Sequence, residues 1–101
     1  LPQHFGTLMV RSGPQAGQRF VLDASLTKLG RHPDSEISLD DISVSRRHAE
    51  IERQSTEYVL RDVGSMNGTY VNQKRVDGVV LQQGDEILVG RFRLIFLGPV
   101  E

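Results

Sequence analysis

Three short polar clusters contain the side chains that could bind an anion: residues 30–33, 45–48 and 64–69. Arg31 offers a planar guanidinium that can form a forked pair with phosphate oxygens. Ser45 adds a hydroxyl donor and Arg46 a second cation, beside backbone amides that could point at the same anion. Asn67 carries both a donor and an acceptor, which suits the main chain of an extended peptide. As a set, the clusters predict a cradle for an anionic group.

Each of these residues also has an ordinary structural interpretation. A lone arginine at a strand end is usually a surface residue with a loose ion pair. Ser43 and Ser45 could simply satisfy the backbone of their own loop. Asn67 followed by Gly68 most often supplies the positive φ of a tight turn. The clusters therefore indicate a site only if they meet in space.

Short apolar segments between turn residues predict an all-β chain, folded as a sandwich. No window keeps a helical pattern of apolar residues over about three turns, whereas strand-like segments recur throughout the sequence. The expected strands are residues 7–11, 19–22, 27–30, 36–39, 49–53, 58–62, 69–72, 85–89 and 92–97. Each polar cluster then lies in a loop at a strand end, where a rigid scaffold holds functional groups accessible to a partner.

The alternation of apolar and polar residues identifies the inward face of one strand but not that of another. The last strand alternates cleanly, so three of its residues are predicted to lie in the core: Phe92, Leu94 and Phe96. In residues 58–63, Tyr58 and Leu60 compete with Val59 and Val63 for the inward face. The register of that strand stays open.

Composition restricts the chain to few kinds of chemistry. With 101 residues, 38% of them hydrophobic, we expect a single domain over 1–101 with its core in about 7–97. A net charge of -1 provides no positive field to attract nucleic acid. The absence of cysteine excludes disulfides and thiolate chemistry, and it agrees with a cytoplasmic location. No apolar run approaches the roughly 20 residues of a membrane helix, so no membrane partner is expected.

As a set, the polar residues resemble the signature of forkhead-associated (FHA) domains. The resemblance rests on Gly30-Arg31, Ser45-Arg46-Arg47-His48, Asn67-Gly68-Thr69 and Val71-Asn72, and it spans residues 7–97. The strings at residues 30–37 and 45–50 look especially like small bacterial FHA proteins. These include the actinobacterial regulators that restrain 2-oxoglutarate dehydrogenase.

The resemblance implies an FHA-type sandwich of two twisted, mostly antiparallel sheets with about eleven strands. Loops at one end would hold a phosphothreonine. Arg31 would bind the phosphate oxygens, Ser45 would donate its hydroxyl to them, and Arg46 would assist. Asn67 would hydrogen-bond the main chain of the peptide. Three further residues would support the loops: Gly30, His48 and Gly68.

One position departs from the commonest pattern of the family. Many relatives have a threonine whose hydroxyl reaches the phosphate, but this chain has Met66. A thioether cannot donate a hydrogen bond, so that contact is expected to be missing or to be replaced by Ser65 or a backbone amide. Ser43 and Val44 are expected to shape a pocket for a residue downstream of the phosphothreonine.

Two other kinds of site are weaker interpretations of the same residues. Ser45, His48 and Asp62 include the residue types of a hydrolase triad, but the sequence has no nucleophile elbow. Several acidic residues lie near His32 and could suggest a metal site: Asp34, Glu36, Asp40 and Asp41. Their spacing is not that of a calcium loop. We therefore expect neither an enzyme nor a metal or other cofactor.

The expected partners are phosphothreonine-containing proteins, with Ser/Thr kinases and metabolic enzymes as candidates. The domain is expected to be a monomer. Because the sequence starts at Leu1 without an initiator methionine, we expect it to be a processed or excised piece. Two alternatives follow: a phosphorylated tail of the same protein occupies the pocket, or the pocket holds unmodified surfaces of metabolic enzymes.

Overall fold

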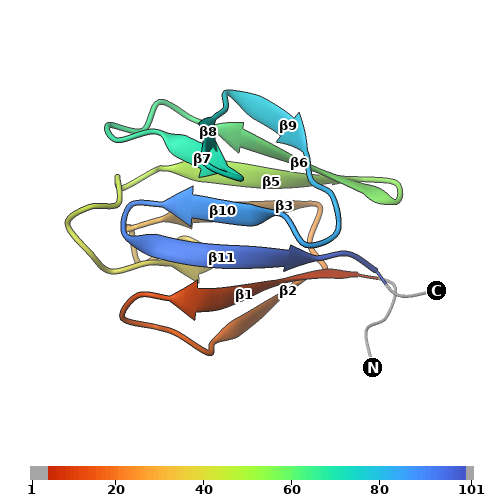
Figure 1. Cartoon of the computed structure of the whole chain (residues 1–101), viewed down its shortest axis with the longest axis horizontal. Coiled ribbons are helices and arrows are strands. Elements are labelled where there is room, and N and C mark those ends of the chain that lie inside the picture. The colour runs from red at the N-terminus through yellow and green to blue at the C-terminus, as the bar shows by residue number, and fades with distance from the viewer. Residues whose placement is uncertain (1–4, 100–101) are drawn as a thin grey trace.

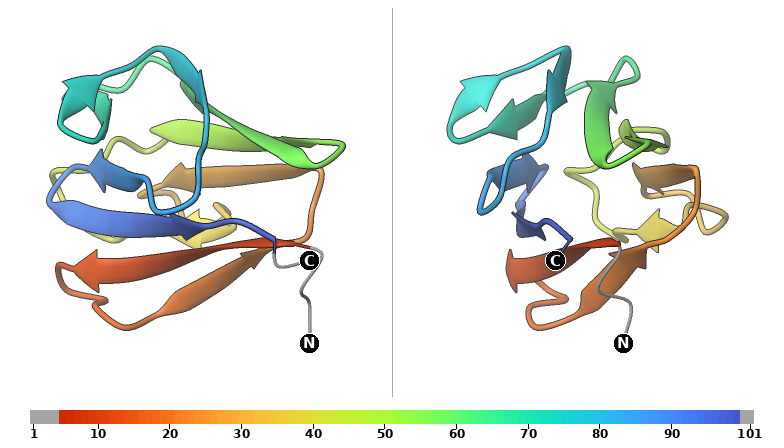
Figure 2. Two further views of the ribbon diagram at one scale, coloured as in Figure 1. Left: turned by 45° about the vertical axis from the view of Figure 1, so that its right-hand side comes forward. Right: turned by 90° about the vertical axis from the view of Figure 1, so that its right-hand side faces the viewer.

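The structure is a computed structural model that describes residues 5–99. Two β-sheets pack face to face, as the two layers in Figure 2 show. The described residues form eleven strands and no helix, so they contain no helix able to cross a membrane. The all-β prediction is confirmed, and so is a sandwich of two mostly antiparallel sheets.

The first sheet has six strands in the order β2-β1-β11-β10-β7-β8 (Figure 1). Its strands are β1 (Gly6–Ser12), β2 (Arg19–Leu22), β7 (Thr69–Val71), β8 (Lys74–Arg75), β10 (Glu86–Val89) and β11 (Phe92–Leu97). All neighbours in this sheet pair antiparallel.

The second sheet has five strands in the order β4-β3-β5-β6-β9. Its strands are β3 (Leu26–Gly30), β4 (Ile37–Ser38), β5 (Ala49–Gln54), β6 (Glu57–Asp62) and β9 (Gly78–Val80). Only β3 and β4 pair in parallel among the described strands.

The short strands β8 and β9 were not expected from the residue pattern. β8 contains only Lys74 and Arg75, both exposed, so it carries no apolar alternation that a sequence could reveal. It forms because Asn72 and Gln73 both have positive φ, of 50° and 71°, which is the geometry of a tight two-residue hairpin turn. The same turn ends β7 at Val71 rather than at the expected Asn72.

Apolar side chains from both sheets fill the space between the layers. Phe92, Leu94 and Phe96 are buried, as predicted. In β6 the open register is settled, because Tyr58 and Leu60 are buried while the neighbouring positions face outward. Burying these large side chains supplies the main favourable free energy of folding.

The loops that carry the three polar clusters gather at one end of the sandwich. β3 and β6 run toward this end, and β5 and β7 start from it, at the left of Figure 1. The turn between β10 and β11 lies at the same end. Strand direction in the two sheets therefore brings segments far apart in sequence together at one rim.

Candidate functional site

A hollow at the loop end brings together candidate binding residues from all three polar clusters. It has a volume of about 280 Å³ and is lined by Arg31, Ile42, Ser43, Val44, Ser45, Arg46, Met66 and Asn67. These residues come from three separate loops. A guanidinium, a hydroxyl and a carboxamide, those of Arg31, Ser45 and Asn67, thus border one small patch.

Arg31 is held at the rim by its own backbone and by one of its guanidinium nitrogens. Its backbone N donates to the carbonyl of Ser45 at 3.0 Å. Its Nε donates to the carbonyl of Val44 at 3.1 Å. The side chain is exposed, and none of the ion pairs within residues 5–99 involves Arg31. The guanidinium is therefore oriented in advance while its terminal N–H donors stay available to a ligand.

Ser45 is half-buried and its hydroxyl links two of the loops. Its Oγ accepts a hydrogen bond of 2.9 Å from the backbone N of Met66. Because the oxygen acts as acceptor in that bond, the hydroxyl hydrogen remains free to be donated to a ligand. The backbone N of Ser45 donates to Nδ1 of His48 at 3.1 Å.

Asn67 joins the third loop to the second. Its Nδ2 donates to the carbonyl of Ser43 at 3.0 Å, across 24 positions of sequence. This bond uses one amide hydrogen and leaves the carboxamide oxygen for a peptide N–H. Gly68 follows with φ of 87°, a conformation that favours glycine, so the Asn-Gly pair serves both a turn and the rim of the hollow.

His48 is fully buried and connects the second loop to the third. Its Nδ1 accepts from the backbone N of Ser45, and its Nε2 lies 2.9 Å from the carbonyl of Gly68. Both ring nitrogens are satisfied when the neutral ring carries its proton on Nε2. Burial lowers the pKa of His48 below 6.5, against opposing effects of the Gly68 carbonyl and Asp62. His48 thus joins the second loop to the third through hydrogen bonds with the Ser45 amide and the Gly68 carbonyl.

We expect the free energy of unfolding to decrease as the pH falls below about 6.5, because His48 gains a proton more easily in the unfolded chain. A group whose pKa is lowered on folding stabilises the protein above its unfolded pKa and loses that contribution as the pH falls. Urea unfolding across this range measures the effect, and NMR titration of the His48 ring measures its cause. A titration midpoint at or above 6.5 would contradict the prediction.

The structure does not bring Ser65 to the hollow, which corrects the expectation that its hydroxyl replaces the missing threonine. Ser65 is buried, its Oγ bonds the carboxylate of Asp62, and the same oxygen accepts from the backbone N of Gly68 at 2.9 Å. Both the donor and an acceptor site of this hydroxyl are therefore engaged inside the protein. Ser65 shapes the third loop rather than its binding surface.

Asp62 organises that third loop. Its carboxylate accepts hydrogen bonds from the backbone of Gly64 at 2.8 Å and of Ser65 at 2.9 Å, and from the hydroxyls of Ser65 and Thr69. Burial acts to raise the pKa of Asp62, but these hydrogen bonds outweigh it and lower the pKa to about 2. A sequence signal for this role is an aspartate with glycine two residues later and serine three residues later, the composition of a turn in which a carboxylate accepts from the backbone amides that follow.

Gly30 allows the first and second loops to approach each other. A Cβ at this position would lie 2.2 Å from the carbonyl oxygen of Arg46 and 3.0 Å from its carbonyl carbon. That same carbonyl accepts from the backbone N of His32 at 3.3 Å. The Arg46 side chain is exposed beside the hollow. A glycine at position 30 therefore leaves room for the Arg46 backbone, so the first and second loops can lie close together.

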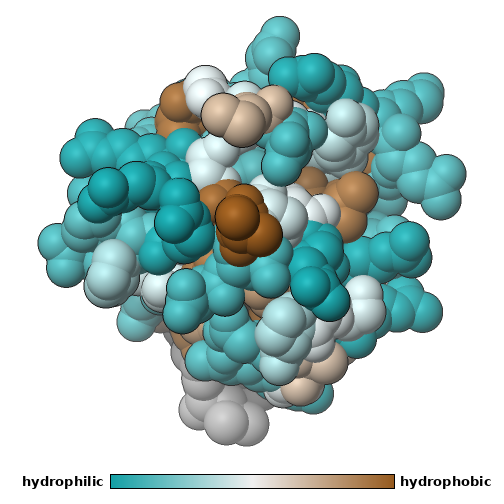
Figure 3. Space-filling view, turned by 90° about the vertical axis from the view of Figure 1, so that its left-hand side faces the viewer, coloured by the Kyte–Doolittle hydropathy of each residue, from teal (hydrophilic) through white to brown (hydrophobic). Residues whose placement is uncertain are grey.

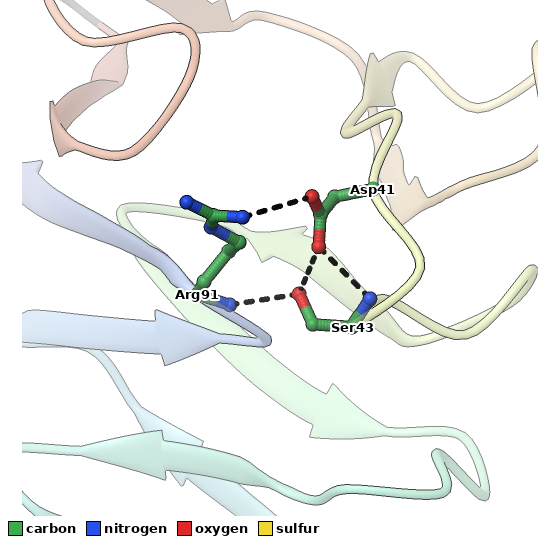
Figure 4. Close-up of polar contacts among 3 residues, drawn as sticks. All are labelled: Asp41, Ser43 and Arg91. Atoms are coloured by element: carbon green, nitrogen blue, oxygen red, sulfur yellow. Dashed lines mark hydrogen bonds and ion pairs between the residues drawn. The ribbon is translucent and has the colours of Figure 1, made fainter.

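A polar cluster that no sequence pattern indicated anchors the second loop to the turn between β10 and β11. Ser43 Oγ donates to Asp41 at 2.6 Å and accepts from the backbone N of Arg91 at 3.0 Å, while the Arg91 guanidinium lies 3.6 Å from Asp41 (Figure 4). Hydrogen bonds from the Ser43 side chain and backbone, with the charge of Arg91, lower the pKa of Asp41 against burial. No local sequence signal joins Asp41 to a residue fifty positions away.

This cluster changes the expectation for Ser43 and Val44. Both border the hollow, but the Ser43 hydroxyl turns toward the β10–β11 turn and the Val44 side chain is buried in the core. The Ser43 hydroxyl is therefore engaged inside the protein, and the role of the two residues in a pocket for a downstream peptide residue stays a prediction.

The residues considered for a hydrolase triad and for a calcium site make other contacts in the structure. Both ring nitrogens of His48 bond backbone groups, so no bond links its ring to the Ser45 hydroxyl. Among residues 5–99, no three acidic or histidine side chains gather as metal ligands. Glu36 instead accepts from the backbone N of Lys28, and Asp41 faces Arg91.

Comparison with known proteins matches residues 27–90 to the FHA domain family. Over 98% of its length, the chain is 56% identical to the glycogen accumulation regulator GarA of Mycobacterium tuberculosis, and it spans 62% of that protein. It is 54% identical to the oxoglutarate dehydrogenase inhibitor of Corynebacterium glutamicum over 100% of the chain and 71% of the relative. A solved FHA domain, studied for phosphothreonine-dependent interactions, superimposes with a TM-score of 0.86 at 34% identity, covering 92% of this chain and 95% of that one.

Proposed function

The chain belongs to the FHA domain family, and from this premise we propose that it binds phosphothreonine peptides in the hollow bordered by Arg31, Ser45 and Asn67. The observation that carries the proposal is the convergence of these three side chains from three loops. The three provide an oriented cation, a hydroxyl with a free hydrogen and a carboxamide. This set complements a phosphate dianion joined to an extended main chain.

Each residue then has a distinct role. Arg31 pairs its terminal N–H groups with the phosphate oxygens, and Ser45 donates its hydroxyl hydrogen to the same group. Arg46 adds a second positive charge at the exposed side of the hollow. Asn67 holds the main chain of the peptide through its carboxamide oxygen, since its amide nitrogen is bonded to Ser43.

Phosphate binding depends on fewer donors than in relatives with a threonine in the third loop. Met66 has no hydroxyl, and its backbone amide already donates to Ser45. The hydroxyl of Ser65 is bonded to Asp62. Affinity for the phosphate therefore rests on Arg31, Ser45 and Arg46.

The protein acts as a regulator without catalytic activity of its own. Support comes from relatives that bear the names of a glycogen accumulation regulator and an oxoglutarate dehydrogenase inhibitor. The partners are proteins phosphorylated on threonine by Ser/Thr kinases, or enzymes of central metabolism, and the site of action is the cytoplasm. The ligand's modification switches such binding, because only the phosphorylated threonine carries the charge that the hollow complements.

Calorimetric titration with matched phosphothreonine, phosphoserine and unmodified peptides tests the proposal. We expect affinity to decrease in that order. Binding of the phosphothreonine peptide should weaken as the pH falls below about 6, where the phosphate dianion takes up a proton, and should weaken with added salt. Equal affinity for the three peptides would refute phosphate recognition while leaving the fold assignment intact.

A further inference from the structure

Asn67 is the residue of this chain whose side chain is chemically most easily modified. Asparagine is among the thermolabile residues of proteins, and Asn67 is followed by a glycine, which has no Cβ to shield its backbone N. Asn67 is exposed, and the loop end that Figure 3 views has a mostly hydrophilic surface, so water reaches the third loop. The sequence contains one other asparagine, Asn72, and it is followed by Gln73. Of the two, Asn67 has the less hindered neighbour.

The modification is a deamidation through a cyclic imide. The backbone N of Gly68 gives up its proton and attacks Cγ of Asn67, so a new N–C bond forms. The bond from Cγ to the side-chain nitrogen breaks, and this nitrogen takes up the proton and leaves as ammonia. Water then opens either carbonyl of the ring, which leaves aspartate or isoaspartate at this position. The reaction needs only water, and it converts a neutral side chain into a carboxylate.

The structure restrains the attacking nitrogen. Gly68 is buried, and its backbone N donates to Oγ of Ser65 at 2.9 Å, while its carbonyl lies 2.9 Å from Nε2 of His48. The Ser65 hydroxyl in turn donates to Asp62, whose pKa of about 2 keeps the carboxylate ionised at neutral pH. The N–H bond that must break is therefore covered by protein and held in a hydrogen bond on its far side.

The side chain that would be attacked is held as well. Nδ2 of Asn67 donates to the carbonyl of Ser43 at 3.0 Å. To close the ring, Nδ2 must leave this carbonyl and the Gly68 nitrogen must leave Ser65. Both hydrogen bonds are lost before the ring forms, so their free energies add to the barrier.

We propose that Asn67 is the deamidation site of the binding hollow, and that Ser65 and Asp62 slow the reaction by holding the Gly68 amide. The Ser65–Asp62 pair does not line the hollow, and this protection gives the pair a role beyond shaping the loop. The reaction itself is independent of phosphopeptide binding. Only its consequence for affinity rests on the proposed function.

Deamidation would inactivate the hollow in two ways. The new carboxylate places a negative charge in the hollow, close to where Arg31 and Arg46 would bind phosphate. The carboxylate also has no hydrogen to donate to the carbonyl of Ser43, so the bond between the third and second loops is lost. We therefore expect the modified protein to bind a phosphothreonine peptide at least about tenfold more weakly.

Peptide mapping by mass spectrometry during incubation at mildly alkaline pH tests the site and its protection. Asn67 should react at least about tenfold more slowly in the folded protein than in urea, because unfolding frees the Gly68 amide. Asn72 is the internal reference, since its amide group bonds Asp85 and the backbone N of Glu86, and it should react more slowly than Asn67 in urea. Equal rates for Asn67 in both states, or no reaction of Asn67 in urea, would overturn the inference.

Two variants that each remove one hydroxyl donor to Asp62 separate the effect of Ser65 from general loosening of the loop. Ser65→Ala frees the Gly68 amide and should speed modification of Asn67 about fivefold. Thr69→Val removes the other hydroxyl but keeps the bond to Gly68, and it should change the rate less than about twofold. Urea unfolding shows whether each variant is folded during incubation. Equal acceleration in the two variants would refute the protection by Ser65.

Hydrogen exchange of the Gly68 amide in the wild-type protein needs no variant. The amide should exchange slowly, because it is buried and bonded to Ser65. Exchange as fast as in the unfolded chain would contradict the proposed restraint, even if Ser65→Ala did not fold.

Titration of Asn67→Asp with a phosphothreonine peptide tests the consequence. Its affinity should be at least about tenfold weaker than that of the wild type. The control Gln73→Glu adds the same charge at an exposed position outside the hollow and should bind as the wild type does. Undiminished affinity of Asn67→Asp would contradict the predicted inactivation. Failure of the proposed function would look different, as equal binding of phosphorylated and unmodified peptides by the wild-type protein, with the modification rates unaffected.

Discussion

Replacing Arg31 with alanine should weaken binding of a phosphothreonine peptide by roughly 10- to 100-fold, the range expected when charge-assisted hydrogen bonds to one phosphate are lost. The effect is large because the Arg31 guanidinium is oriented by its bond to the carbonyl of Val44 and has no partner in an ion pair within residues 5–99. Calorimetric titration measures it directly. The melting temperature should hardly change, since the side chain is exposed.

Two further variants show whether the affinity depends on the position and shape of the Arg31 guanidinium or only on positive charge. Arg31→Lys keeps the charge but loses both the fork and the Nε bond to Val44, so its affinity should lie between those of the wild type and Arg31→Ala. Arg93→Ala removes an exposed arginine from β11, outside the hollow, and should bind as the wild type does. If Arg93→Ala weakened binding as much as Arg31→Ala, general electrostatic attraction would replace the proposed contact.

Replacing Gly30 with alanine should destabilise the protein by about 3 kcal/mol, near the upper end of the usual cost of overpacking. The new Cβ would lie 2.2 Å from the carbonyl oxygen of Arg46, which is backbone and cannot rotate away. Relief requires the first and second loops to separate, and this movement displaces Arg31 and Ser45, whose backbones are bonded at 3.0 Å. Affinity for the phosphopeptide should therefore decrease together with stability.

Gly78→Ala is the matched control. Gly78 lies in β9, its φ is not positive, and a Cβ there would meet nothing closer than the Leu60 carbonyl at 3.7 Å. We expect its free energy of unfolding to stay within about 0.5 kcal/mol of the wild type. Urea unfolding and peptide titration of both variants give the comparison. Equal stability of the two variants would show that the loops can separate at little cost.

The different roles of the Ser45 and Ser65 hydroxyls could not be predicted from the sequence. Ser45 and Ser65 have the same donor and acceptor groups, and both lie in loops with the composition of a binding site. In the structure, Ser45 keeps its hydrogen for a ligand because it accepts from Met66, whereas Ser65 gives its hydrogen to Asp62. Residue type alone could not separate the two, because the difference lies in the partner of each oxygen.

The short strands and the anchoring cluster have a similar explanation. β8 has two exposed residues and forms because of the turn before it, so alternation could not reveal it. Asp41 and Arg91 meet only because the β10–β11 turn lies at the same end of the sandwich as the second loop. Contacts of this kind depend on strand order within the sheets, which no local pattern encodes.

The sequence by itself determined the local features: strands from alternation, turns from Asn and Gly, and an inventory of groups able to hold a phosphate. These depend on each residue and its near neighbours, and the clean pattern of Phe92, Leu94 and Phe96 was enough to assign part of the core. Only the tertiary structure decided which polar groups are satisfied internally and which remain for a ligand. It also placed the exposed side chains of Ile42 and Met66 beside the same hollow, because hydrogen bonds between segments distant in sequence hold the loops together.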